Sequence, residues 1–153
     1  MIRLTKLSEY AVVVMTQMAA GGAVHNAASL AERTGLPAPT VAKLLKLGVR
    51  GGLIVSHRGA AGGYGLSRSP ACITVAQVVQ AIDGPIALTE CVDGVEGACG
   101  VETLCPIRGG WDRLNQAVRR ALEEVSLADM VAPHPAFAAR ADKASLSGQQ
   151  PAA

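Results

Sequence analysis

LIVSHRGAAGGYGLS, residues 53–67, predicts a β-hairpin, and this hairpin determines which small helical fold we expect. Leu53 to Ser56 has the apolar, β-branched character of a strand, and Tyr64 to Ser67 that of a returning strand. The turn between them is rich in glycine, which allows positive φ angles and a close approach of the backbone to a ligand.

Three helices are expected before the hairpin. The first ends at Gly21–Gly22, and its apolar face consists of Leu4, Leu7, Ala11, Val14, Met15 and Met18. The second covers residues 27–34, with Asn26 as its N-cap and Gly35 in the left-handed C-cap conformation. Pro37 precedes the third, whose predicted buried stripe is Val41, Leu44, Leu45 and Val49.

Two short helices joined by a glycine-containing turn form a helix-turn-helix unit, and a hairpin directly after them gives the layout of a winged helix. We therefore expect a mostly α-helical fold, with a generic three-helix bundle as the alternative. In such a protein the third helix enters the DNA major groove at its N-terminal end, and an arginine of the wing enters the minor groove. The DNA-binding residues predicted on this basis are Pro39, Thr40, Lys43, Arg58, Gly59, Gly62, Gly63 and Tyr64. For Arg58, the alternative is a solvated hairpin arginine.

Charge is distributed unevenly along the 153 residues, whose net charge is +2. Residues 1–70 carry eight basic and two acidic side chains, whereas residues 71–153 carry six basic and ten acidic ones. A basic half suggests a polyanionic partner such as double-stranded DNA, although an ordinary solvated surface has the same composition. The apolar run Val12–Met15 is far shorter than the ~20 residues of a membrane span, and no signal peptide is visible, which predicts a cytoplasmic protein.

Two further helices are expected after the wing. Thr74 is the predicted N-cap of a helix that ends at Gly84, and a longer helix runs from about Trp111. The apolar stripe of this longer helix consists of Trp111, Leu114, Val118, Ala121 or Leu122, and Val125. A second copy of the helix is an economical partner for that stripe, and packing onto its own domain is the alternative. Ser126 is expected to cap a last turn, residues 127–131, before a disordered tail.

Three of the four cysteines, Cys91, Cys99 and Cys105, lie within fifteen residues of an acidic loop that contains several glycines. In a cytoplasmic protein, clustered thiols indicate metal or redox chemistry rather than structural disulfides. Their C-x7-C-x5-C spacing is neither a C-x2-C zinc pair nor the ferredoxin run. Soft thiolates favour an iron–sulfur cluster, zinc or copper(I).

Three thiolates leave one position open in a site with four ligands. Glu9, Glu102, a histidine or an exogenous group are the candidates for it. The remaining cysteine, Cys72, is expected to be a buried structural residue. No histidine lies in the loop to activate a thiolate and no nucleophile motif is present, which argues against an enzyme.

Together, these motifs resemble the Rrf2 family of winged-helix regulators from about Arg3 to Met130. The resemblance rests on the opening RLTKLSEYA (residues 3–11), the wing HRGAAGGY (57–64) and three cysteines ahead of a long helix. The branch that looks most similar is the regulators of SUF iron–sulfur assembly operons. Its characteristic segments are TGLPAPTVAK (34–43), GPIALTEC (84–91) and CPIRGGW (105–111).

The resemblance implies a homodimer formed through the long helix, with a [2Fe–2S] or [4Fe–4S] cluster held by the three cysteines and one other residue. In the IscR branch this residue is a histidine three positions after the last cysteine, where the present chain has Arg108. In the NsrR branch it is an N-terminal acidic residue that reaches across the dimer, and the opening motif aligns Glu9 with it. A surface carboxylate on the first helix is the alternative for Glu9.

The sequence thus predicts a DNA-binding repressor, not an enzyme, that senses iron–sulfur status and controls a SUF operon, without a membrane partner or a small-molecule substrate. A winged-helix regulator with structural zinc and a thiol or nitric-oxide switch are the alternatives. The expected divisions are a DNA-binding domain (1–70), a connecting helix (71–84), a cluster-binding loop (85–106), a dimerisation helix with a terminal turn (107–132) and a tail (133–153).

Overall fold

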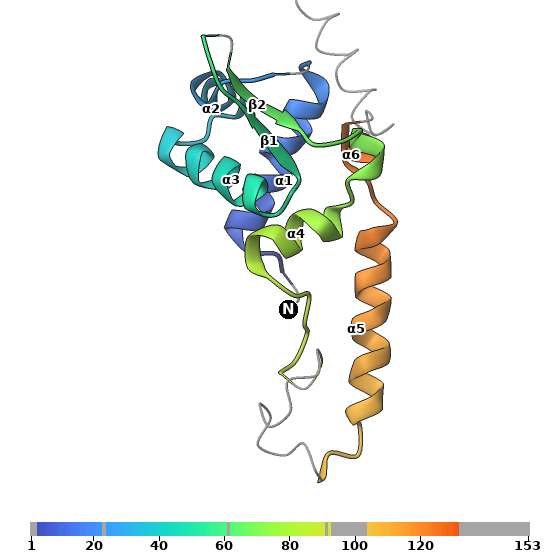
Figure 1. The fold of residues 1–153 in the computed structure, drawn as a ribbon. Coiled ribbons are helices and arrows are strands. Elements are labelled where there is room, and N and C mark those ends of the chain that lie inside the picture. Colours follow the sequence, from blue (N-terminus) through green and yellow to red (C-terminus); the bar gives the residue numbers. More distant parts are fainter. Residues whose placement is uncertain (1–2, 23, 61, 91, 93–103, 132–153) are drawn as a thin grey trace, which may run out of the picture.

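The computed structural model describes residues 3–22, 24–60, 62–90, 92 and 104–131, without the side chain of Arg108. This part of the chain is mostly helical, with one two-stranded antiparallel sheet (Figure 1). In chain order, its elements are α1 (Lys6–Ala20), α2 (Ala27–Thr34), α3 (Ala38–Arg50), β1 (Ile54–His57), β2 (Gly63–Leu66), the 3-10 turn η1 (Pro70–Cys72), α4 (Val75–Asp83), α5 (Arg108–Glu123) and α6 (Leu127–Val131).

The boundaries of the first three helices follow from local capping chemistry. The side-chain oxygen of Asn26 accepts a hydrogen bond from the Ser29 amide at 2.7 Å, and Gly35 ends α2 with a φ of 69°. Both predicted caps are confirmed. Helix α3 begins directly after Pro37.

The apolar faces predicted for α1 and α3 are confirmed except at two positions. Val49 is exposed, and Gly48 takes its place in the buried face of α3 because a side chain there would meet Ile54 of the hairpin. Leu4 precedes α1 and is 41% exposed, so it does not belong to the buried face of that helix.

The hairpin follows α3 after a three-residue turn. Its register pairs Ile54 with Leu66 and His57 with Gly63, so each strand differs from its predicted bounds by one residue. Leu53 and Ile54 are buried against the helices, whereas the rest of β1 is exposed. The hairpin is therefore anchored in the core by Leu53 and Ile54, and β1 becomes exposed toward the turn, as in a winged helix.

Helices α1 to α3 and the hairpin form one unit, here called the head. The chain returns to this head at α4 and α6. A capping box at Thr74 begins α4, since its side chain accepts from the Gln77 amide and the Gln77 side chain accepts from the Thr74 amide. Leu127 of α6 is fully buried, and its amide donates to the carbonyl of Ile73 at 2.8 Å. The predicted caps at Thr74 and Ser126 are both confirmed.

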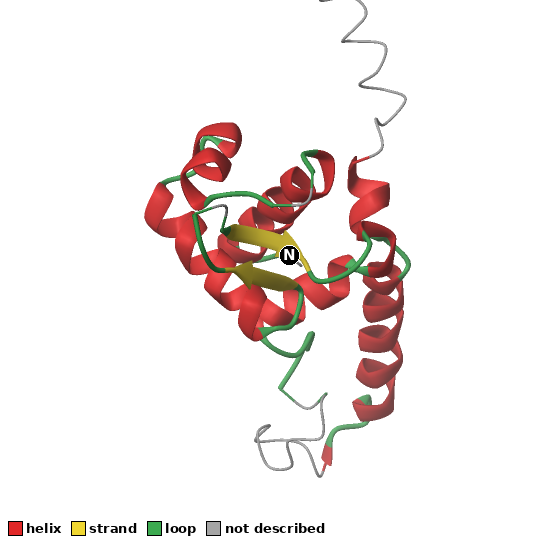
Figure 2. Cartoon of the chain, turned by 45° about the horizontal axis from the view of Figure 1, so that its top comes forward, coloured by secondary structure: helices red, strands yellow, loops and turns green. Residues whose placement is uncertain are grey.

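Helix α5 lies beside the head and extends away from it (Figures 1 and 2). It begins at Arg108, three residues before the predicted start, and it ends before Val125. Among its described side chains, only that of Asn115 is buried. In the described part of the chain, no helix has both the length and the hydropathy that a membrane span requires.

Candidate nucleic-acid interface and cysteine segment

Helix α3 presents a polar face to solvent because the core occupies its apolar face. Its exposed residues include Pro39, Lys43, Lys46 and Arg50, and Thr40 is half-buried. Pro39, Thr40 and Lys43, which we predicted to read DNA, all lie within its first six residues.

The turn of the hairpin carries the other predicted DNA-binding residues. Arg58 and Gly59 are exposed, and Gly59 has a φ of 109°. A Cβ atom at Gly62 would lie 2.5 Å from the His57 carbonyl oxygen, and the Gly62 amide donates to Gly59 at 2.9 Å. Glycine is therefore required at both positions of this tight turn. Tyr64 is half-buried and packs against the core.

Backbone hydrogen bonds join the hairpin to α3. The Leu53 amide donates to the Gly48 carbonyl at 2.9 Å, and the Ser67 amide donates to the Leu53 carbonyl at 2.9 Å. The Ser67 hydroxyl closes the turn by donating to the Gly52 carbonyl at 2.7 Å. Figure 1 shows α2, α3 and the hairpin together at the end of the molecule that lies away from α5.

Uncompensated positive charge collects on these two elements. The cations are Lys43, Lys46, Arg50 and Arg58, all of them exposed. No carboxylate of the described residues lies within ion-pair distance of any of them; the ion pairs found there join Lys6 to Glu9 and Arg119 to Glu123. Such a surface attracts a polyanion.

The cysteine segment is described only at its two ends. Cys91 and Cys99 lie outside the described residues, and Cys105 is half-buried with a free thiol. Within the described residues, no three histidine, cysteine or acidic side chains gather as metal ligands would. The predicted site at the three cysteines therefore stays a prediction.

The N-terminal part of this segment, residues 85–90, is connected to α5. The amide of Leu88 donates to the side-chain oxygen of Asn115 at 3.1 Å, and Ile86 and Val92 are buried. The hydrogen bond places Leu88 beside Asn115 of α5.

Glu9, the predicted fourth ligand, lies in the first turn of α1. Its carboxylate is exposed and accepts from the Lys6 ammonium at 2.8 Å. This hydrogen bond, followed by the charge of Glu9, raises the pKa of Lys6. The position suits an N-terminal carboxylate, because negative charge is favourable at the start of a helix.

Asp83 connects the start of α1 to the start of the cysteine segment. Its Oδ2 atom accepts from the hydroxyls of Thr5 and Ser8, each at 2.7 Å, and the Ser8 side chain is fully buried. Gly84 follows with a φ of 87° and turns the chain into the segment. The sequence does not predict this contact, because residues 5 and 83 are 78 positions apart.

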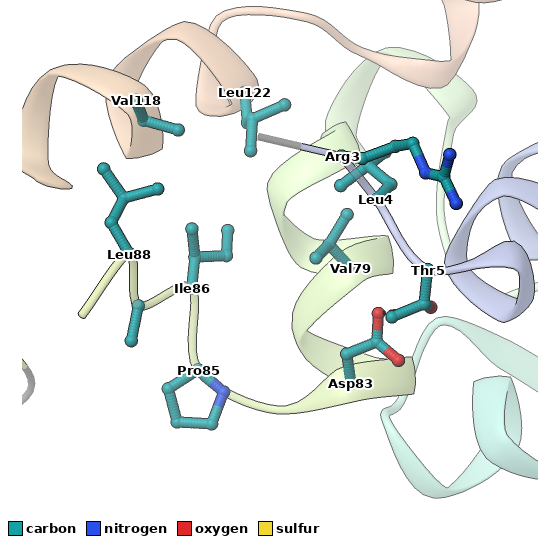
Figure 3. A pocket seen from close by; sticks show the side chains of 11 residues that line it. Arg3, Leu4, Thr5, Val79, Asp83, Pro85, Ile86, Leu88, Val118 and Leu122 are labelled. Atoms are coloured by element: carbon teal, nitrogen blue, oxygen red, sulfur yellow. Dashed lines mark hydrogen bonds between the residues drawn. The ribbon is translucent and has the colours of Figure 1, made fainter. Parts of the chain in front are cut away.

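A pocket of about 590 Å³ lies between α4, α5 and the segment before α1 (Figure 3). Its apolar lining includes Leu4, Val79, Ile86, Leu88, Val118 and Leu122. Arg3 and Asp83 add one charge of each sign. Part of the predicted stripe of α5 therefore faces this pocket and is not covered by the described part of the chain.

Cys72 is exposed, and the expectation of a buried structural cysteine was wrong. It ends the short η1 turn, where its carbonyl accepts from the Arg68 side chain at 3.0 Å while the residue after it, Ile73, enters the core. Cys72 and Ile73 are both apolar, so their hydrophobicity does not show which of the two points into the core.

The family model described as Rrf2, iron-dependent transcriptional regulator, matches residues 4–133. The chain belongs to the Rrf2 family. Since this is a family of transcriptional regulators, the expectation that the chain is not an enzyme is confirmed.

Named relatives agree with this assignment. An HTH-type transcriptional regulator of Azotobacter vinelandii, ORF2, is 35% identical over 133 residues, which cover 86% of this chain and 80% of that protein. The HTH-type transcriptional regulator IscR of Xenorhabdus nematophila is 32% identical over 136 residues, which cover 85% of this chain and 79% of IscR.

A solved structure is similar over most of the chain. CymR of B. subtilis, described as the global cysteine regulator, has a TM-score of 0.68 and 27% identity, covering 86% of this chain and 98% of CymR. The Rrf2-type winged-helix fold is thus confirmed. The greater similarity to SUF-type regulators stays a prediction.

Proposed function

We propose that this Rrf2 protein is a homodimeric repressor that binds double-stranded DNA and responds to an iron–sulfur cluster. The observation that carries the proposal is the pairing of α3 with the hairpin, both of which present exposed cations free of carboxylate partners among the described residues. Pro39, Thr40 and Lys43 contact the major groove. The wing, from Arg58 to Tyr64 with Gly59, Gly62 and Gly63, approaches the minor groove.

The dimer forms through α5. Leu114 and Ala121 are exposed and Trp111 is half-buried, although all three belong to the apolar stripe of this helix. The pocket beside Val118 and Leu122 continues the same apolar surface onto the head. A second copy of α5 covers such a surface, and the twofold symmetry it creates matches two DNA half-sites.

Cys91, Cys99 and Cys105 hold the cluster, and Glu9 of the partner subunit supplies the fourth ligand. Three soft thiolates suit iron and sulfide, and the free thiol of Cys105 fits this role. A bound cluster supplies a rigid connection among residues far apart in the chain. The bonds from Thr5 and Ser8 to Asp83 hold the start of α1, and with it Glu9, in a fixed position on α4.

Loss of the cluster loosens the cysteine segment from its neighbours and changes how the two DNA-binding heads are held. The regulated genes are those of iron–sulfur assembly, the SUF operon, so that cluster supply controls its own production. The protein acts where the chromosome is, in the cytoplasm.

The experiment compares Cys99→Ala with Cys72→Ala, its matched control outside the segment. Both variants are purified without oxygen, and their iron, acid-labile sulfide, zinc and visible absorption are measured. We expect the wild type and Cys72→Ala to carry iron and sulfide with charge-transfer absorption and Cys99→Ala to lose both. One zinc per chain without sulfide would indicate a structural zinc site instead, and a full spectrum in Cys99→Ala would refute the ligand assignment.

A further inference from the structure

The outer end of the wing depends on a contact outside the hairpin. An isolated two-stranded hairpin is at best marginally stable in water, so its position requires support from another element. Such support is found at His25, in the connection between α1 and α2. The His25 amide donates to the Tyr64 carbonyl at 2.8 Å, and the Tyr64 amide donates to the His25 carbonyl at 2.7 Å. His25 thereby adds one residue of a third strand to the wing.

The ring of His25 fixes this connection to the end of α1. Nε2 lies 3.2 Å from the carbonyl oxygen of Met18 and 3.0 Å from that of Gly22. Since both neighbours are acceptors, Nε2 carries the proton and donates to them. The side chain is buried, with 6% of the residue exposed, although polar residues of this kind are usually more accessible.

Neighbouring glycines allow this close arrangement. A Cβ atom at Gly21 would lie 2.8 Å from the His25 ring and 2.6 Å from the Arg33 guanidinium, so both groups pack over the end of α1. A Cβ atom at Gly63 would lie 2.5 Å from the His25 carbonyl oxygen. The wing strand can therefore approach His25 only because residue 63 has no side chain.

We infer that His25 is a positioning residue for DNA recognition, one that touches no DNA but holds the wing so that Arg58 reaches the duplex. The ring holds the backbone of residue 25 on α1, and that backbone holds Tyr64, which is two residues from the turn at Gly62. The inference rests on the proposed binding of DNA by the wing.

The test measures affinity and its salt dependence on a duplex that the wild-type protein selects from a randomised 30-base-pair library. His25→Ala removes the ring but leaves the backbone pairing possible. We expect it to weaken binding about fivefold or more and to reduce the slope of log K against log salt by about one, as loss of the Arg58 contact does. In combination with Arg58→Ala, the losses should not multiply, since both changes remove the same contact.

Two variants separate positioning from general stability. His25→Gln places an amide nitrogen where Nε2 lies and should restore affinity and slope. Thr74→Ala removes the cap of α4, outside the hairpin, and should lower the melting temperature without changing the slope. The inference is overturned if His25→Ala lowers only the melting temperature, or if its loss multiplies with that of Arg58→Ala. If Arg58→Ala itself leaves binding unchanged, the proposed DNA contact of the wing is wrong.

Discussion

At the scale of single residues, the surroundings of a side chain determine whether its substitution should affect binding or stability. Arg58 is exposed at the outer end of the wing and has no carboxylate partner among the described residues. Asp83, by contrast, is committed to two hydroxyl groups within the protein. Substitution of the first should change binding, and substitution of the second should change stability.

Arg58→Ala is expected to weaken binding to the selected duplex by ~1–3 kcal/mol, the worth of one base-edge contact. The folded protein should keep its melting temperature, because Arg58 packs against nothing in the core. Binding isotherms at fixed salt measure the effect. Equal affinity of variant and wild type would mean that Arg58 is merely solvated.

Asp83→Ala is expected to lower the free energy of unfolding by ~1–3 kcal/mol, because the buried Ser8 hydroxyl loses its acceptor. Urea denaturation measures this free energy of unfolding. Glu123→Ala is the control, since its exposed pair with Arg119 at 4.0 Å is worth ~0–1 kcal/mol. A loss no greater than that of Glu123→Ala would show that Asp83 does not hold α1 to α4.

At the scale of elements, local capping decides where helices begin, and distant contacts decide which face is buried. The caps at Asn26, Gly35 and Thr74 were predictable because each depends on residues within one helical turn. The exchange of Val49 for Gly48 was not, because it depends on the approach of Ile54 from the hairpin.

The α6 cap gives a pH-dependent prediction. Asp129 accepts from the hydroxyl and amide of Ser126, and these bonds lower its pKa from the ordinary value of an aspartate in the folded protein. Because the pKa of Asp129 is lower in the folded than in the unfolded protein, its ionised form stabilises the folded state at neutral pH. This contribution disappears as the pH falls through the folded-state pKa. The difference in melting temperature between wild type and Asp129→Asn should therefore be full at pH 6 and shrink as the pH falls through the folded-state pKa of Asp129. A constant difference across this range would contradict the assignment.

At the scale of the whole molecule, the arrangement of α5 separates two surfaces. The elements proposed to face DNA, α3 and the hairpin, lie at one end of the molecule, and α5 extends away from them (Figure 1). The second surface is the apolar stripe of α5 with its adjoining pocket. A dimer that uses the second surface leaves the first accessible, so one protein can bind DNA and respond at the cysteine segment simultaneously.

Leu114→Asp should convert the proposed dimer to a monomer, because it places a charge in the apolar stripe of α5. Gln116→Asp is the matched control, since residue 116 lies roughly 200° further round the helix. Sedimentation equilibrium measures the mass, and circular dichroism checks the helices. We expect only the Leu114→Asp variant to dissociate and to lose its affinity for the selected duplex. If both variants remain dimeric, another surface forms the dimer.

The sequence alone determined the winged helix, because caps, turn glycines and apolar spacing all act within a few residues. It also located the exposed cations of α3 and the wing, since these follow from the stripe that the core buries. Only the tertiary structure decided that His25 supports the wing, that Asp83 joins α1 to α4 and that Cys72 is exposed. These features depend on residues 39 to 78 positions apart, or on the direction of a single turn. Hydrogen bonds and close packing establish them only once the chain has folded.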